Sequence, residues 1–159
     1  MAVLNLSVLP KDLLQNNERK PLVYETASFF YEKEILMQII HSDNAPAALG
    51  PYSQAMRVGD LVYTSGQIGI DPAAGKITSD TVEGQVAQVC ANLRAVLAAA
   101  GTDLTRVVKT TCFLADMGDF AAFNEVYARH FTGKPARSCV AAKALPAGAL
   151  CEIEVIAEV

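Results

Sequence analysis

The sequence lacks tryptophan and has few charged residues for its length. Charged residues make up 19% of the 159 positions, and 13 basic residues stand against 17 acidic ones, for a net charge of −4. No cluster of lysine and arginine is present, so nucleic acid is not expected as a partner. Hydrophobic residues reach 52%, which excludes intrinsic disorder and suggests that self-association covers some of them.

Histidine and cysteine are too few and too scattered to form a metal site. The four cysteines form no C-x-x-C pair, and the two histidines lie far apart: Cys90, Cys112, Cys139, Cys151, His41 and His130. The cysteines fall at apolar or small-residue positions, which favours reduced, buried thiols over disulfides and indicates a cytoplasmic protein. We expect the histidines to lie on the surface and at a helix end rather than to act as catalysts.

Long hydrophobic runs and targeting signals are also absent. No apolar stretch approaches the ~18 residues of a membrane-spanning helix, so we expect no membrane association. The start MAVLNLSVLPKDLL lacks the basic region and cleavage site of a secretory signal, and five acidic residues in 1–36 argue against a mitochondrial presequence. Phosphate-binding loops, H-E-x-x-H and G-x-S-x-G are missing as well.

The composition changes near Met37. Residues 1–36 contain asparagine, glutamate and aromatics, whereas the following chain is rich in alanine, glycine and valine. We expect a single domain over 37–159. Two interpretations of 1–36 stay open: a leader or mis-assigned upstream start, and a genuine accessory segment.

The chain from Met56 onward predicts the element order β-β-α-β-α-β-β. AMRV and LVYTSG are short strands around a Gly59-Asp60 turn. Residues 81–101 carry an apolar helical stripe, with Asp80 and Glu83 resembling a capping box and a glycine at the end. RVVKTTCFL predicts a buried strand, residues 116–131 a second helix, and ARSCVAA and LCEIEVIAEV the last strands. Two helices cannot cover both faces of such a sheet, so we predict an α+β fold: a mixed sheet with both helices on one face.

Two of these strands carry charges that a core would not contain. The period of two places Arg137 and Cys139 on one face of their strand. In the last strand, Glu152 and Glu154 lie opposite a clean apolar face. Alternating glutamates are usually a solvated face, but an arginine among small residues is suited to grip a carboxylate with its fork-shaped guanidinium. The pattern alone therefore indicates an α+β oligomer with a possible anion-binding arginine.

From about Asn44 to the C-terminus, the chain resembles the RidA (YjgF) family of enamine/imine deaminases. The segments that carry the resemblance are APAALGPYSQA (45–55), TSGQIGIDPAAGKI (64–77), QVCANLRAVLAAAG (88–101), VVKTTCFLADMGDFAAFNEVYARHF (107–131), PARSCV (135–140) and CEIEVIA (151–157). Their order and spacing match over roughly three quarters of the chain. PARSCV followed by L-P and E-I-E is the specific part, and residues 1–36 have no counterpart.

The resemblance implies a chorismate-mutase-like subunit, a homotrimer with active sites between subunits, and no cofactor. It implies hydrolysis of reactive 2-aminoacrylate-type enamines and imines, such as 2-iminopropionate, to 2-oxo acids and ammonia. A small substrate of this kind has one carboxylate as a handle and is intrinsically reactive, so a site without a metal would suffice.

The resemblance also assigns roles to residues of this chain. Arg137 would hold the substrate carboxylate, and Glu152 would position the attacking water. Tyr52 would take part in catalysis as a hydroxyl group. The pocket would also be lined by Ser65, Gly66 and Asn124, and Cys139 would lie beside the substrate.

Several alternatives stay open at this point. Glu154 competes with Glu152, because both lie on the same strand face, and packing is the alternative role of Cys139. The family also contains members described as endoribonucleases or translation inhibitors, against which the acidic charge balance counts. A third possibility is a non-catalytic protein that binds small carboxylates. Glu152 separates that binder from the enzyme, because only the enzyme needs an activated water.

Overall fold

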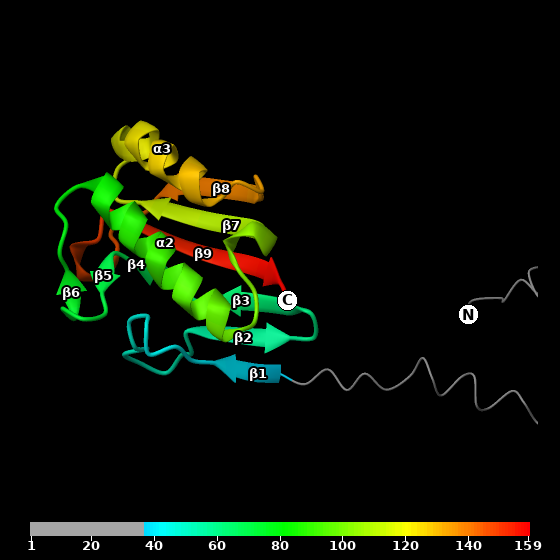
Figure 1. The fold of residues 1–159 in the computed structure, drawn as a ribbon. Coiled ribbons are helices and arrows are strands. Elements are labelled where there is room, and N and C mark those ends of the chain that lie inside the picture. The colour runs from blue at the N-terminus through cyan, green and yellow to red at the C-terminus, as the bar shows by residue number, and fades with distance from the viewer. Residues whose placement is uncertain (1–36) are drawn as a thin grey trace, which may run out of the picture. The chain divides into compact units, whose positions relative to one another are not determined.

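A mixed β-sheet carries two helices on one face (Figure 1). The computed structural model describes residues 37–159, and the expectations for residues 1–36 lie outside these. The sheet has seven strands, and its main path runs β1-β2-β3-β9-β7-β8, with β4 also paired to β9. Only the β7–β8 pair is parallel, and all the other pairs are antiparallel. The predicted α+β class is therefore confirmed.

The strands and helices follow the expected order, with short additions. The sheet strands are β1 (Met37–Ile40), β2 (Ala55–Val58), β3 (Leu61–Thr64), β4 (Gln67–Ile68), β7 (Val107–Leu114), β8 (Ala136–Ala141) and β9 (Cys151–Glu158). The helices are α2 (Val82–Ala99) and α3 (Phe120–His130), and a separate hairpin joins β5 (Ile70–Asp71) to β6 (Lys76–Ile77). Single helical turns η3 (Leu104–Arg106), η4 (Met117–Asp119) and η5 (Pro146–Gly148) complete the chain. Strands β1 and β4–β6 were not expected. Strands β4–β6 have two residues each, too few to show a period.

The core lies between the sheet and the two helices. The predicted stripe of α2 is buried throughout, as are Phe123 and Tyr127 of α3. Every second residue of β9, from Cys151 to Ala157, faces this core, and the residues between them are more exposed. The tight turn between β2 and β3 is made by Gly59, whose φ of 61° is disfavoured for residues with a side chain.

The expected start of α2 is wrong in one detail. Asp80 and Glu83 do not form a capping box. Instead, Thr81 is the N-cap, and its hydroxyl oxygen accepts a hydrogen bond from the backbone N–H of Gly84 at 3.2 Å. The cap moves by one residue because Thr81 has the extended backbone that an N-cap requires.

Buried polar residues of α2 hold two irregular segments at the end of the sheet. The amide nitrogen of Asn92 donates to the carbonyls of Ile68 and Ile70, at 3.1 and 2.9 Å. The amide of Gln85 accepts from the N–H of Leu150 at 2.8 Å and donates to the carbonyl of Ser79 at 2.9 Å. Through these bonds to backbone groups of β4, β5 and the segments before α2 and β9, α2 fixes the segments that line the pocket described next.

Candidate active site

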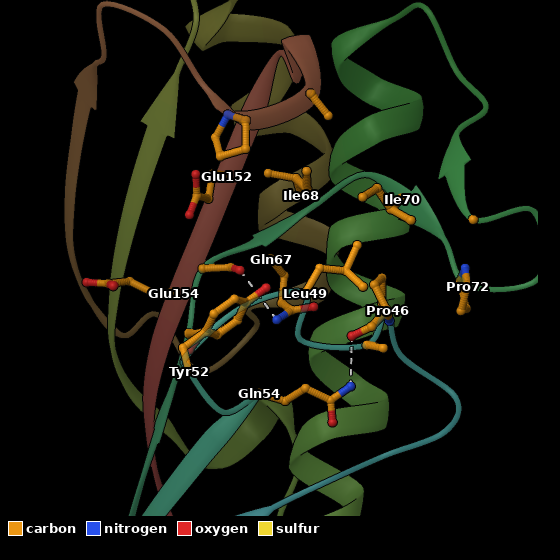
Figure 2. A pocket seen from close by; sticks show the side chains of 16 residues that line it. Pro46, Leu49, Tyr52, Gln54, Gln67, Ile68, Ile70, Pro72, Glu152 and Glu154 are labelled. Carbon is orange, nitrogen blue, oxygen red and sulfur yellow. Dashed lines mark hydrogen bonds between the residues drawn. The ribbon is translucent and has the colours of Figure 1, made fainter.

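A pocket of about 880 Å³ opens where β4 and the start of β9 meet the loop before β2 (Figure 2). Four of the residues assigned by the family pattern line it, and they are Tyr52, Ser65, Gly66 and Glu152. Glu154, the competitor of Glu152, also lines it. Much of the remaining wall is apolar, including Leu49, Ile68 and Ile70. The structure thus joins residues that are up to a hundred positions apart in the sequence.

Gly66 makes room for the carboxylate of Glu152. A Cβ atom at position 66 would lie 1.8 Å from Oε1 of Glu152, a distance that no structure tolerates. The clash is with the far end of a flexible side chain, so a substitution here would displace the carboxylate rather than the backbone. Gly66 therefore contributes to the site by lacking a side chain.

The carboxyl group of Glu152 is the perturbed acid of the pocket. Partial burial, and secondly the negative charge of Glu154, raise its pKa above the ordinary value. A carboxylate with a raised pKa is a stronger base and accepts a proton from water more readily. Figure 2 shows both glutamates projecting from β9 on the same side of that strand.

The hydroxyl of Ser65 joins two segments of the pocket wall, the one after β3 and the one before β2. It donates to the carbonyl of Ser53 at 2.6 Å, and the N–H of Ser65 donates to the carbonyl of Gln54 at 2.9 Å. With its proton engaged in this way, the hydroxyl oxygen of Ser65 is an acceptor towards a ligand. Tyr52 differs, because its ring is 54% exposed and lies beside the pocket entrance.

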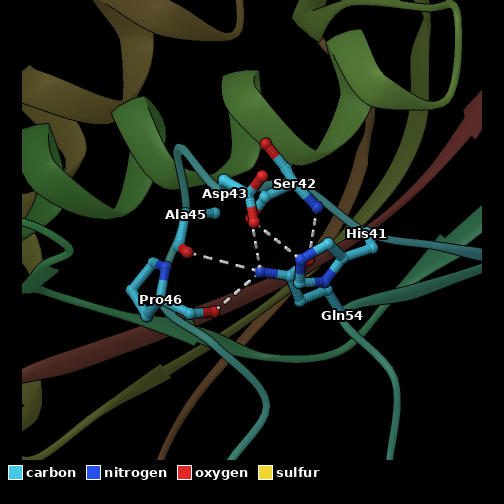
Figure 3. A network of polar contacts seen from close by, with 6 residues as sticks. All are labelled: His41, Ser42, Asp43, Ala45, Pro46 and Gln54. Atoms are coloured by element: carbon cyan, nitrogen blue, oxygen red, sulfur yellow. Dashed lines mark hydrogen bonds and ion pairs between the residues drawn. The ribbon is translucent and has the colours of Figure 1, made fainter.

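Gln54 was not singled out from the sequence, yet its amide holds the loop that forms one wall (Figure 3). Its oxygen accepts from the N–H of Ser42 at 2.7 Å. Its nitrogen donates to the carbonyls of Ser42, Ala45 and Pro46, at 3.0, 3.4 and 2.8 Å. The side chain is buried, so these bonds are shielded from water. Its place within the GPYSQ segment was the only sequence signal.

The other assigned residues lie apart from the pocket, between α3 and β8. The guanidinium of Arg137 donates to the amide oxygen of Asn124 at 2.8 Å. Its central carbon lies 4.7 Å from the ring centroid of Tyr127 and 5.5 Å from that of Phe120. Among residues 37–159, no carboxylate forms an ion pair with this arginine.

Within one chain, Arg137 and Glu152 lie on opposite faces of the sheet. Arg137 points towards α3, on the helix-covered face. Glu152 alternates with the buried Cys151 and Ile153, so it points to the other face. Strand β7 also separates β8 from β9. One subunit therefore holds two separate half-sites, one with the carboxylates and one with the arginine.

Cys139 belongs to the arginine half-site and is not activated as a nucleophile. It is the strand partner of Cys112 in the parallel β7–β8 pair. It packs against the core and is partly buried. Burial raises the pKa of the Cys139 thiol, although the nearby charge of Arg137 opposes the effect. The pKa of each buried thiol is raised to about 12 by burial, at Cys90, Cys112 and Cys151. All four are unpaired thiols in the structure, and three of them are buried as expected.

The histidines lie where the sequence placed them. His41 is exposed and bonds Asp43 at 2.9 Å, and His130 ends α3 beside Arg94. Among residues 37–159, no group of three histidine, cysteine or acidic side chains is arranged to hold a metal ion. In the same part of the chain, no helix is long and apolar enough to cross a membrane.

Comparison with known proteins places the chain in a family. Residues 42–159 match the family described as Endoribonuclease L-PSP. The RutC family protein y4sK of Sinorhizobium fredii is 51% identical over 122 residues, which are 76% of this chain and 97% of that protein. The mouse 2-iminobutanoate/2-iminopropanoate deaminase is 47% identical over 124 residues, which are 77% of this chain and 92% of that protein.

A solved structure agrees with these relatives. The crystal structure of RidA from an Antarctic Psychrobacter species is 44% identical, with a TM-score of 0.74, over 77% of this chain and 99% of that one. The matched range, residues 42–159, contains both helices and every strand of the sheet except β1. The chain belongs to the endoribonuclease L-PSP family, which confirms the resemblance to the RidA (YjgF) deaminases.

Proposed function

We propose that this protein hydrolyses reactive 2-imino acids, and their enamine tautomers, to 2-oxo acids and ammonia. The observation that carries the proposal is the state of Arg137, a half-buried cation held by neutral groups and without a carboxylate partner among residues 37–159. A guanidinium in this state is suited to an anionic ligand with two oxygens. The mouse relative is named a 2-iminobutanoate/2-iminopropanoate deaminase, which supports a small 2-imino acid as that ligand.

The residues of the two half-sites fit the steps of imine hydrolysis. Arg137 binds the carboxylate of the substrate, and Glu152 takes a proton from a water molecule whose oxygen attacks the imine carbon. Glu152 passes this proton to the imine nitrogen, so the C=N bond becomes a carbinolamine. Glu152 then takes the hydroxyl proton of the carbinolamine and delivers it to the amino group as the C–N bond breaks. The carbonyl and ammonia form, one water is consumed and no oxidant or cofactor is needed. Tyr52 lies beside the pocket entrance and is suited to bind the developing alcohol oxygen.

The separation of the half-sites supports an active site between two subunits. In a homotrimer, the arginine half-site of one copy meets the carboxylate half-site of the next. The uncovered face of the sheet supports assembly, because a row of apolar side chains crosses it: Ile39, Met56, Tyr63 and Ile156 are successive partners on β1, β2, β3 and β9. Ile39 is 65% exposed and Tyr63 is 43% exposed in the single chain, which favours burial against another copy.

RNA cleavage is the second candidate, because the family description names an endoribonuclease. The net charge of −4 and the two glutamates in the pocket count against an RNA ligand. We place the reaction in the cytoplasm, where four unpaired thiols stay reduced. We assign it to residues 37–159, with no part for residues 1–36.

The first prediction concerns the carboxylate handle. Arg137→Ala lowers kcat/KM for 2-iminopropionate on the order of 100-fold or more, because two charge-assisted hydrogen bonds are lost. Arg137→Lys recovers part of this, since an ammonium keeps the charge but not the fork. Arg106→Ala, which removes the exposed ion pair with Glu158, is the control and keeps full activity. Near-normal hydrolysis by a folded Arg137→Ala protein, checked by its thermal transition, would contradict the proposal.

The second prediction concerns the base. Glu152→Gln lowers kcat by about 100- to 10,000-fold, since general base catalysis is lost. Binding of pyruvate, measured by calorimetry, is retained. Gly66→Ala displaces the same carboxylate and lowers kcat with little change in thermal stability. A Glu152→Gln protein that binds and hydrolyses normally would exclude this residue as the base, and RNA cleavage at an unchanged rate would favour the second candidate.

The third prediction is a pH dependence. Glu152 acts as its carboxylate, so kcat falls as the pH drops through its raised pKa. Glu154→Gln removes the neighbouring negative charge, lowers the pKa of Glu152 and moves the acidic limb of the kcat profile to lower pH. A limb that stays in place, or moves to higher pH, would show that Glu154 does not influence the base.

The fourth prediction concerns assembly. Residues 37–159 form a trimer with the activity of the full chain, because both half-sites and the apolar face lie within them. Light scattering of the shortened protein, beside the full chain, measures its mass. Monomeric or insoluble material would mean that residues 1–36 belong to the assembly.

A further inference from the structure

We infer that Tyr127 is a positioning residue for the proposed reaction, since its anchored ring fixes the guanidinium of Arg137 in the orientation that receives the substrate carboxylate. The inference rests on the proposed function and extends it to a residue with no assigned role. Tyr127 touches Arg137 but does not line the pocket, so its effect passes through the arginine.

The spacing along α3 builds a cradle for the arginine. Phe120, Asn124 and Tyr127 recur on one side of the helix, the side that faces β8. Two of them offer ring faces to the guanidinium, with centroids at 5.5 and 4.7 Å, and Asn124 accepts one hydrogen bond at 2.8 Å. The ring contacts engage the guanidinium carbon, so the N–H groups other than the one bound to Asn124 remain for a ligand.

The Tyr127 ring is itself held from two sides. Its hydroxyl shares a hydrogen bond of 2.8 Å with the hydroxyl of Thr110, a residue with no exposed surface. The ring of Phe131 stacks on it with a centroid distance of 4.3 Å. Thr110 is also the direct strand partner of Arg137 in the β7–β8 pair, so one point of the sheet carries both the arginine and the anchor of its cradle.

Every group of the cradle is neutral, so the positive charge of Arg137 stays available to an anionic ligand. A carboxylate at the position of Asn124 would orient the guanidinium equally well but would neutralise its charge. Two aromatic rings and an amide fix the orientation and leave the charge to the ligand. A half-buried arginine held for structural reasons alone would gain from an acidic partner, and none is paired with it among residues 37–159.

The test measures the inhibition constant Ki of pyruvate, and KM and kcat for 2-iminopropionate, in the full-length protein. Tyr127→Leu removes the ring and raises Ki and KM about two- to thirtyfold, with a smaller change in kcat. Tyr127→Phe keeps the ring but loses the bond to Thr110, and raises both less. Val62→Ala is the control, because it removes fully buried side-chain atoms from β3, a strand that β9 and β7 separate from β8 and Arg137. It lowers the melting temperature and leaves Ki unchanged.

Two further variants separate positioning from general stability. Asn124→Asp places a carboxylate on Arg137 and raises Ki more than Asn124→Ala does, although the aspartate retains the hydrogen bond. In the Arg137→Ala background, Tyr127→Leu has no additional effect on Ki, because a positioning residue acts only through the group it positions.

The outcomes distinguish this inference from the proposed function. If Arg137→Ala raises Ki while Tyr127→Leu changes it no more than Val62→Ala does, the inference is overturned and the proposed function stands. An equal effect of Tyr127→Leu with and without Arg137 would overturn it as well. Should Tyr127→Leu fail to fold, Tyr127→Phe and Asn124→Asp decide in the same way. If Arg137→Ala leaves both constants unchanged, the proposed function fails together with the inference.

Discussion

The alternation of side chains along a β-strand separates the two charged groups on which the proposed site depends. Glu152 stands between buried neighbours on β9 and faces away from the helices, whereas Arg137 faces α3 from the edge strand β8. No rotation of a side chain brings groups on opposite faces of one sheet together. A single chain therefore does not place Arg137 and Glu152 on the same small substrate, which is why we propose that a second copy completes the site.

Because the two half-sites lie on opposite faces of the sheet, different kinds of contact hold them in place. The arginine half-site is built on regular elements, with one side of α3 packed over β8. The carboxylate half-site depends on short strands and loops. Their backbone groups are bound by buried amide side chains, from Asn92 and Gln85 of α2 and from Gln54, which directly precedes β2. A pocket of non-periodic backbone can keep its shape only where such side chains fix it.

The length of an element, and therefore the number of repeats of its hydrophobic pattern, decided whether it could be predicted from the sequence. The long helix, β7 and β9 each span eight residues or more, so their stripes and alternation were readable and the predicted order is confirmed. Strands β4–β6 have two residues each and no period, and the cap of α2 depended on the backbone of Thr81 rather than on the Asp80 pattern. Short elements of this kind are set by tertiary hydrogen bonds that a local pattern does not contain.

The candidate site was partly readable for the same reason. The faces of Arg137 and Glu152 followed from their strands, and the family motifs supplied Tyr52, Ser65 and Gly66. That Asn124 would join Arg137 rather than Glu152 depended on how α3 packs against β8, which lies beyond any single segment. Tyr127 was not singled out as a site residue from the sequence, and its contact with the guanidinium is visible only in three dimensions.

Both charged groups are less well compensated in the free chain than they would be in water or in an ion pair. The raised pKa of Glu152 means that folding favours its protonated form, so its contribution to stability is greatest at low pH and is lost as the pH rises through the folded-state pKa. Arg137 keeps its charge beside neutral groups only. A substrate carboxylate would supply the negative partner that Arg137 lacks. A proton shared with the reacting water would reduce the negative charge of Glu152. The electrostatic deficit of the folded chain and the proposed chemistry of imine hydrolysis therefore have one origin, which is a carboxyl group beside a second carboxylate and a guanidinium held by neutral groups only.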